Sequence, residues 1–264
     1  MRVGIITGSG SYALPGLEGG VPDRVPTRFG SAEVTHGSFA GVEVVHVSRH
    51  LPGHRLVSHQ VEHRANIVAL RDAAVDAIVA VTVCGSLDPA LAPGSLVVFD
   101  DLHFLANRLP DGSICTLHDE PGGAGRGHWI FDLPFARPLR AALLAGARDA
   151  GHDVRDGGCY GHVDGPRFNT RAELRTLVQA GVAAVSQTAG PETVLAGEAG
   201  VPYALLGFVT DYANGIKPDD PTPVAELARL LDASGGILAT VLRAALPRIE
   251  PAGLGPVGTR FSWD

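Results

Sequence analysis

Apolar residues along the chain occur either in short continuous runs or at helical spacing. The continuous runs predict strands at residues 3–6, 32–38, 42–47, 77–83, 96–99, 182–186 and 203–209, with residues 153–163 extended. The helical spacing predicts helices at residues 60–74, 135–150, 170–180, 192–199 and 224–246. Because apolar strands alternate with helices, we expect an α/β fold with a central mixed, mostly parallel sheet flanked by helices.

The segments between these elements contain no linker, repeat or low-complexity tract. Residues 102–127 are rich in Gly, Pro and Asp and predict a long loop, which in a compact domain is often functional. A chain of 264 residues is long enough for one large domain with its own core. We therefore expect one domain at residues 1–250, followed by a Pro- and Gly-rich C-terminal tail at residues 251–264.

Composition narrows the class of protein. The formal net charge of −7 argues against a nucleic-acid partner, which would require a basic face. No apolar run approaches the roughly 20 residues of a membrane span, and the N-terminus lacks the apolar core of a signal peptide. Cys84, Cys115 and Cys159 are odd in number and widely spaced, as expected of free thiols in a reducing compartment. We expect a cytoplasmic protein with neither a membrane nor a nucleic-acid partner.

A glycine-rich turn, TGSG at residues 7–10, follows the first predicted strand. Its backbone amides and the Ser9 hydroxyl are suited to a phosphate, although such a turn often serves only as a connection. The third glycine of a dinucleotide-binding fingerprint is absent, so a dehydrogenase is not indicated.

Residues 59–63 read H-x-x-E-H, the pattern of an inverted zinc-peptidase motif. On one continuous helix, His59 and His63 would share a face and Glu62 would be available as a base. No third ligand is identifiable. A zinc hydrolase is therefore kept as an alternative of a different class.

Polar residues also follow several predicted strands. Arg49 and His50 form a candidate anion clamp, Thr82 and Cys84 end the strand at 77–83, and Asp211 is a candidate acid or base. In an open sheet, such strand ends line the ligand crevice. Taken singly, each has a structural explanation: a surface pair, a buried inert thiol or a helix cap.

The order and spacing of these segments carry more information than any one of them. TGSG, RH-x3-H, V-x2-RANI-x-AL, TVCGSL, DGPRF-x2-RAE, TAGPE-x2-LA-x-EAG and TDY follow one another from about residue 3 to residue 250. This order resembles the trimeric nucleoside phosphorylase family, and most closely its 5′-methylthioadenosine phosphorylase branch.

The resemblance implies a homotrimer of purine salvage that binds inorganic phosphate and a nucleoside at sites shared between subunits. It assigns phosphate binding to Ser9, Arg49, His50, Thr82 and Thr188. It assigns nucleoside binding to Val83, Cys84, Gly85, Phe168, Asn169, Ser186, Gln187, Asp211 and Ala213, with His128 supplied by a neighbouring subunit. Within these sets, the resemblance implies that Asp211 and His50 are the catalytic residues.

In this family a phosphate dianion attacks C1′ of the ribose while the purine leaves. A protonated Asp211 near N7 would neutralise the departing base, and general acid help of this kind is typically worth ~10²–10⁴ in rate. The resemblance implies no metal and no cofactor, since inorganic phosphate is the co-substrate. The expected reaction releases a free base and a 5′-modified ribose 1-phosphate from a 5′-methylthioadenosine-like nucleoside.

Three positions depart from the family pattern. Gln187 replaces a methionine under the ribose, Ala213 replaces a second aspartate, and Asn169 stands where the branches carry glutamate or serine. An amide at position 187 would be able to hydrogen-bond a ribose hydroxyl or the base edge. The alternatives are therefore a phosphorylase of 6-oxopurine or 5′-modified pyrimidine nucleosides, or a catalytically silent nucleoside-binding homologue.

Overall fold

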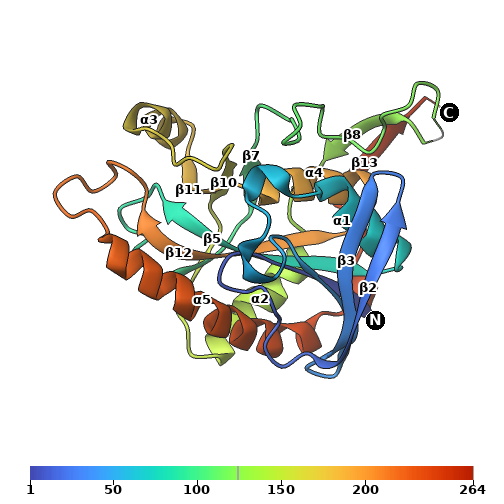
Figure 1. Cartoon of the computed structure of the whole chain (residues 1–264), viewed down its shortest axis with the longest axis horizontal. Helices are drawn as coiled ribbons and strands as arrows, with labels where there is room; N and C mark the ends of the chain where they lie inside the picture. Colours follow the sequence, from blue (N-terminus) through green and yellow to red (C-terminus); the bar gives the residue numbers. More distant parts are fainter. Residues whose placement is uncertain (124, 264) are drawn as a thin grey trace.

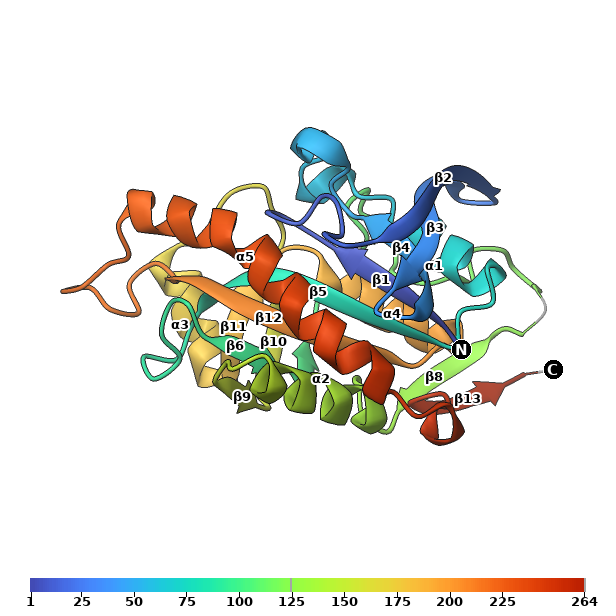
Figure 2. The same cartoon turned by 90° about the horizontal axis from the view of Figure 1, so that it is seen from below.

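The computed structural model describes residues 1–123 and 125–263. Its centre is a mixed sheet of eleven strands with helices on both faces (Figures 1 and 2). The strands are β1 (Arg2–Thr7), β2 (Glu18–Thr27), β3 (Gly30–Phe39), β4 (Val42–Ser48), β5 (Ala77–Ser86), β6 (Leu96–Val98), β7 (Asp101–His103), β8 (Gly127–Phe131), β9 (Val154–Asp156), β10 (Cys159–His162), β11 (Val182–Ser186), β12 (Tyr203–Tyr212) and β13 (Gly258–Ser262). The helices are α1 (His63–Asp72), α2 (Arg137–Asp149), α3 (Arg171–Gln179), α4 (Ala189–Glu198) and α5 (Val224–Ala245).

The main path of the sheet has the order β2-β3-β4-β1-β5-β11-β10-β7. A branch leaves this path at β5, which also pairs with β12; β12 pairs with β6, and β6 pairs with β9. The pairs β1–β4, β1–β5, β5–β12, β10–β11, β7–β10 and β6–β9 are parallel. The hairpins β2–β3–β4 and the pairs β5–β11 and β6–β12 are antiparallel. The predicted α/β fold with a mixed, mostly parallel sheet is confirmed.

In the described part of the chain, two large apolar cores, one on each face of the sheet, hold the layers together, and a smaller third cluster packs α3 against β11. Helices α1 and α4 bury residues such as Ile67 and Leu195 in one core. Helices α2 and α5 bury residues such as Leu143 and Leu242 in the other. By length and composition alone the segment Val224–Arg248 would be able to cross a membrane, but half of it is buried inside the fold, as in a core helix. Figure 2 shows α5 lying along the sheet beside α2.

Local sequence explains where the elements begin and end. Thr170 caps α3 as predicted, because its hydroxyl accepts from the Glu173 backbone while the Glu173 carboxylate accepts from the Thr170 backbone. The helix expected from residue 60 begins instead at His63, since Val61 is extended and separates α1 from a short 3₁₀ turn at Ser58–Gln60. Strand β2 was not predicted, because it contains two prolines and is largely exposed.

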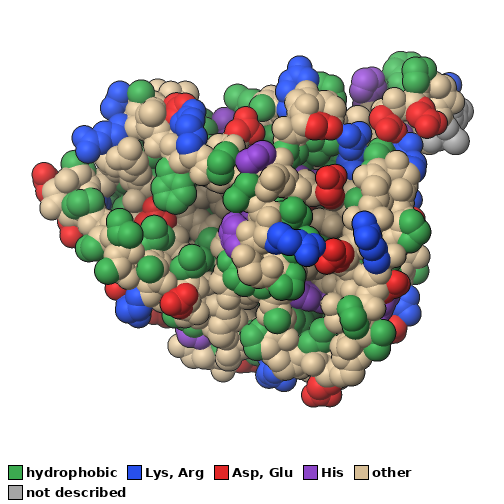
Figure 3. Space-filling view, viewed as in Figure 1, with side chains coloured by type: hydrophobic (Ala, Val, Ile, Leu, Met, Phe, Trp, Pro, Cys, Tyr) green, Lys and Arg blue, Asp and Glu red, His purple; other side chains and the backbone are tan. Residues whose placement is uncertain are grey.

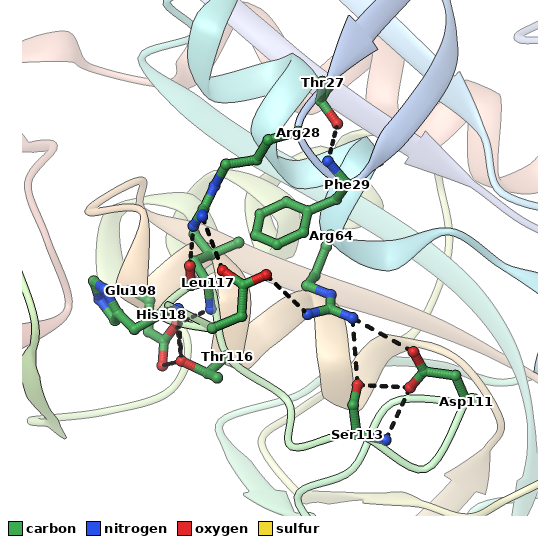
Figure 4. Close-up of polar contacts among 11 residues, drawn as sticks. Thr27, Arg28, Phe29, Arg64, Asp111, Ser113, Thr116, Leu117, His118 and Glu198 are labelled. Carbon is green, nitrogen blue, oxygen red and sulfur yellow. Dashed lines mark hydrogen bonds and ion pairs between the residues drawn. The ribbon is translucent and has the colours of Figure 1, made fainter. Parts of the chain in front are cut away.

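The predicted long loop after β7 is fastened to the body by charged side chains (Figure 4). Arg28, which follows β2, pairs with Asp119, and Arg64 on α1 pairs with Asp111. Both guanidinium groups lie over the ring of Phe29, at 4.2 and 4.8 Å from its centroid. These contacts give the loop a defined course at this end of the molecule.

The C-terminal tail folds back on the chain. Strand β13 pairs antiparallel with β8, which ends the long loop, and the pair projects from the body (Figure 1). Ile130 and Phe261 on this two-stranded ribbon, and Trp263 directly after it, are exposed. The sequence did not predict either strand, because their pairing joins segments about half the chain apart.

Candidate active site

A cavity of about 350 Å³ opens where β1, β4, β5 and β12 reach their carboxyl ends. The hollow is visible near the centre of the face drawn in Figure 3, where histidine side chains reach its edge. The cavity is lined by every site residue predicted from the sequence except His128, namely Ser9, Arg49, His50, Thr82, Val83, Cys84, Gly85, Phe168, Asn169, Ser186, Gln187, Thr188, Asp211 and Ala213. Residues more than 200 positions apart are thus brought to one site.

A buried ion pair forms the floor of one end. Arg49 follows β4, and its Nε and Nη2 donate to the two carboxylate oxygens of Glu192 at 2.6 and 2.8 Å, while Nη1 donates to the carbonyl of Val81 at 3.1 Å. Both charged side chains are only 1% exposed. Tyr203 adds a 3.0 Å hydrogen bond to the same carboxylate. Since a guanidinium has five N–H donors, two are left for an anion in the cavity.

Glycines of the TGSG turn allow this packing. A Cβ on Gly8 would lie 2.5 Å from Nη1 of Arg49, so any other residue would displace the guanidinium. Gly10 has φ of 76° and would place a Cβ 2.5 Å from the Leu231 carbonyl of α5. The turn is therefore held between Arg49 and α5, with Ser9 lining the cavity.

His50 lies beside Arg49 and is buried. Its Nδ1 lies 2.9 Å from the carbonyl of Leu56, an acceptor, so Nδ1 carries the proton and Nε2 is left as an acceptor. Burial and the neighbouring Arg49 charge lower the pKa of His50 to about 4, so the ring is neutral near pH 7. A neutral imidazole here accepts a proton or a hydrogen bond from a ligand. The ring of His54 stacks on it at 4.4 Å and donates to or accepts from Tyr12 at 2.9 Å.

The amino end of α4 reaches the same end of the cavity. Thr188 precedes the first residue of α4 and is buried, and Ser186 and Thr82 place their hydroxyls 3.0 Å apart. A helix amino terminus together with these hydroxyls favours an anionic ligand. The fold thus brings Arg49, His50, Thr82 and Thr188 to one cavity.

Asp211 lies on the other side of the cavity, at a bulge near the end of β12. A Cβ on Gly85 would lie 3.2 Å from its carboxylate, so the glycine on the neighbouring β5 makes room for it. Burial raises the pKa of Asp211, although a 2.9 Å hydrogen bond from the Thr210 hydroxyl opposes the shift. The carboxyl therefore takes up a proton more readily than a carboxyl in water.

Cys84 lines the cavity but is unsuited to nucleophilic chemistry. Burial, reinforced by the nearby Asp211, raises the pKa of its thiol far above the ordinary range. The thiol therefore stays protonated and directs a weak hydrogen bond to the Phe208 carbonyl. The packing role considered from the sequence fits this environment.

An exposed loop that contains Phe168 and Asn169 lines a third side of the cavity. Phe168 lines the cavity yet is 72% exposed, and Asn169 lies beside it. Gln187 accepts from the Ser58 hydroxyl at 2.9 Å and donates to the Arg167 carbonyl at 3.0 Å. Its amide is therefore engaged with the protein. Ala213, the position expected to carry a second aspartate, is buried at the edge of the cavity.

His128 lies outside the cavity of its own chain. It is on β8, where its ring meets Trp263 edge-on at 5.9 Å. The expectation that it reaches a neighbouring subunit's site concerns a second chain and stays a prediction.

The zinc pattern is not assembled by the fold. His59 lies exposed in the 3₁₀ turn, whereas His63 begins α1 and is buried against Glu192, so the two rings do not share a helix face. Neither nitrogen of His63 has a hydrogen-bond partner in the described structure. The alternative of two zinc ligands on one helix face is not supported, because extended Val61 separates the 3₁₀ turn of His59 from α1.

Sequence reasoning did not assign several residues of the site. Glu192 was given no role from the sequence, although a glutamate within a largely apolar helix is a signal for a buried partner. Ser58 and His54 sit in short turns without periodicity. Leu227 and Leu231, four residues apart on α5, give the cavity an apolar wall.

Known proteins share this architecture. The sequence model of the family described as "Phosphorylase superfamily" matches residues 2–246. A "Probable 6-oxopurine nucleoside phosphorylase" of Thermococcus kodakarensis is 35% identical over 92% of this chain and 91% of its own length. An "S-methyl-5′-thioadenosine phosphorylase" of Bradyrhizobium diazoefficiens is 33% identical over 99% of this chain and 89% of its own. The solved methylthioadenosine phosphorylase of Schistosoma mansoni in complex with adenine is 28% identical, with a TM-score of 0.84 over 94% of this chain and 91% of its own.

Proposed function

Since this chain belongs to the phosphorylase superfamily and is a nucleoside phosphorylase, we propose that its substrate is a 5′-deoxy-5′-substituted adenosine of the 5′-methylthioadenosine kind. The products would be adenine and a 5-modified ribose 1-phosphate. The observation that carries the choice of an amino-purine is the Asp211 carboxyl, which is partly buried near the carboxyl end of β12 and has a raised pKa.

Inorganic phosphate, the co-substrate, would bind at the end formed by Arg49, His50 and the amino end of α4. Glu192 fixes the Arg49 guanidinium, whose two remaining N–H groups would donate to phosphate, and neutral His50 would offer Nε2 to a phosphate hydroxyl. As the phosphate oxygen bonds to C1′, the C1′–N9 bond breaks and its electron pair moves to the purine. The positive charge on the ribose ring is stabilised by the bound dianion.

The leaving purine would be neutralised by Asp211. In its protonated form the carboxyl donates its proton toward N7, and its other oxygen accepts from the 6-amino group. Because burial raises its pKa, the carboxyl holds a proton more readily than a carboxyl in water, and a held proton is what general acid catalysis requires.

The 5′ substituent would meet an apolar wall. Leu227 and Leu231 project from one side of α5 into the cavity, next to the TGSG turn. Apolar side chains gain about 25 cal/mol for each Å² of surface that a thioalkyl group covers, whereas a 5′-hydroxyl buried there would lose its hydration. This favours a 5′-thioalkyl group over the hydroxyl of adenosine.

A 6-oxopurine nucleoside is the second candidate. Asn169 and Asn214 both line the cavity, and an amide can pair with O6 and N7 of a 6-oxopurine. Relatives named 6-oxopurine nucleoside phosphorylase are as similar in sequence as those named for methylthioadenosine.

We also propose a homotrimer in which His128 of a neighbouring subunit closes the cavity. The exposed apolar residues Ile130 and Phe261 on the β8–β13 ribbon and Trp263 directly after it, beside His128, support a contact between chains. Light scattering coupled to size-exclusion chromatography tests the assembly. A mass three times that of the 27.4 kDa chain is expected, and a monomer would refute the shared site.

The substrate is tested by base release from a panel with and without phosphate. The panel holds 5′-methylthioadenosine, adenosine, inosine, 5′-methylthioinosine, uridine and 5′-amino-5′-deoxyuridine. We expect phosphate-dependent release of adenine, fastest from 5′-methylthioadenosine. Preferred release of hypoxanthine would establish the second candidate, and preferred release of uracil would refute both purine assignments.

A further inference from the structure

Gln187 joins three segments that line the cavity. It lies between β11 and Thr188, the residue before α4. Its amide oxygen accepts from Ser58 in the 3₁₀ turn at 2.9 Å, and its amide nitrogen donates to the backbone carbonyl of Arg167 at 3.0 Å. One side chain therefore connects the turn before α1, the predicted phosphate end and the loop at residues 164–169.

The loop at residues 164–169, here called the base loop, has few other ties. In the structure as described, no backbone–backbone hydrogen bond joins it to the rest of the chain, and the preceding Val163 makes the last one, to Ser186. Its outer side is held by the exposed pair of Arg167 and Glu173, with distances of 2.7 and 2.9 Å. Exposed pairs of this kind contribute little to holding a loop. On the side that faces the cavity, Gln187 makes the hydrogen bond that joins the base loop to the chain before α4.

Close packing supports the same role. A Cβ on Gly165 would overlap both the Gln187 amide oxygen and the Ser58 hydroxyl. The loop backbone therefore lies directly against this hydrogen-bonded pair. Pro166, Phe168 and Asn169, which follow Gly165, all line the cavity.

We propose that Gln187 is a positioning residue that fastens the base loop and so sets where Phe168 and Asn169 meet the nucleoside. Its amide oxygen and one of its two N–H groups are committed to Ser58 and Arg167, so the side chain acts through the loop instead of reading the base or ribose. The kinetic consequence rests on the proposed phosphorolysis, whereas the effect on the loop does not.

The test replaces the Gln187 side chain and measures how readily the base loop opens in the absence of substrate. Gln187→Met keeps the length of the side chain and removes both hydrogen bonds. We expect amide hydrogen exchange in residues 164–169 to speed up about tenfold, and trypsin to cleave after Arg167 about tenfold faster. With nucleoside as the varied substrate, KM is expected to rise three- to tenfold, while KM for phosphate stays within twofold.

Two further variants separate the positioning role of Gln187 from a nonspecific effect of the substitution on folding. Gln179→Met makes the same chemical change at an exposed position on the neighbouring α3 and is expected to change neither loop exchange nor cleavage. Ser58→Ala removes one of the two bonds and is expected to give the same effects at a smaller size. It also serves if Gln187→Met does not fold.

The outcomes distinguish the possibilities. Unchanged exchange and cleavage in both Gln187→Met and Ser58→Ala would overturn the proposal, whatever the kinetics. A changed base preference with an unchanged loop would also overturn it and make Gln187 a reader of the substrate. If amide exchange in the base loop of the variants is faster but the protein catalyses no phosphorolysis, the positioning role of Gln187 is supported and the proposed function is refuted separately.

Discussion

The two ends of the cavity are built in opposite ways. At the predicted phosphate end, Arg49, His50, Thr82 and Thr188 are all buried and come from the ends of strands or the start of a helix. At the predicted nucleoside end, Phe168 is 72% exposed. It belongs to a loop whose side-chain ties include the Gln187 amide and the exposed pair of Arg167 and Glu173. The predicted phosphate site thus lies among buried residues, whereas the predicted base site includes an exposed loop. Substitutions should accordingly abolish chemistry at one end and shift preference at the other.

The largest effect is expected from Arg49→Met. Losing the guanidinium removes two donors to phosphate and leaves Glu192 buried without its partner. We expect kcat/KM to fall about a thousandfold and the free energy of unfolding to fall by about 3–5 kcal/mol. Steady-state kinetics and urea unfolding measure the two effects.

A double variant separates the loss of activity from the loss of stability. Arg49→Met with Glu192→Gln removes the uncompensated charge, so stability should largely return while activity does not. Arg55→Met, at an exposed position, is the matched control. Near-normal turnover of Arg49→Met would contradict the phosphate site.

Acid should destabilise the protein steeply. Burial lowers the pKa of His46 and His50 to about 4, and that of His63 and His162 to about 3. The unfolded chain takes up protons near pH 6.5 and the folded chain does not, so stability is intact at pH 7.5 and is lost as the pH falls below about 6.5. Between pH 6.5 and 5.5 we expect a loss of about 1 kcal/mol for each of these histidines.

Urea unfolding across this pH range measures how steeply the free energy of unfolding changes with pH. His63→Leu should reduce the number of protons taken up on unfolding by about one. It loses no hydrogen bond, since neither nitrogen of His63 has a partner in the described structure. His59→Gln, at an exposed position, should leave the slope unchanged. A pH-independent stability over this range would show that these histidines are not buried in the neutral form.

Asp211→Asn tests whether Asp211 protonates the leaving base and selects a 6-amino purine. The amide cannot donate a proton as an acid does, so turnover of 5′-methylthioadenosine is expected to fall about a hundredfold. Activity on the matching 6-oxopurine nucleoside should fall less, because an amide pairs with O6. Asp220→Asn in the loop before α5 is the control, and equal losses on both substrates would argue against a base-reading role.

The smallest effect is expected from Phe168→Ala. Stacking of an aromatic ring on a base is worth about 1–3 kcal/mol, and a ring this exposed belongs at the lower end. KM for the nucleoside should rise about fivefold with KM for phosphate unchanged. Val178→Ala, exposed on α3, is the comparison, and a change in KM for phosphate would contradict the separation of the two ends.

The core elements could be predicted because they follow local rules, whereas most of the cavity lining was implied by the family resemblance. Strands β1, β5 and β12 are apolar runs, and a polar residue at the end of such a run is placed in the crevice by the sheet itself. The break at Val61 was missed because residues 60–74 keep an apolar periodicity across it. Strands β8 and β13 were missed because each is stable only when paired with a distant segment. The ion pair of Arg49 with Glu192 and the engagement of Gln187 by Ser58 depend on tertiary contacts more than 100 residues apart.

The central claim is that the buried end of the cavity delivers phosphate to C1′. ³¹P NMR of the reaction with 5′-methylthioadenosine and inorganic phosphate follows this bond directly. The account predicts one sugar 1-phosphate for each adenine released, and no adenine when phosphate is left out. Adenine release at the same rate without phosphate, with free 5-methylthioribose as the other product, would contradict it.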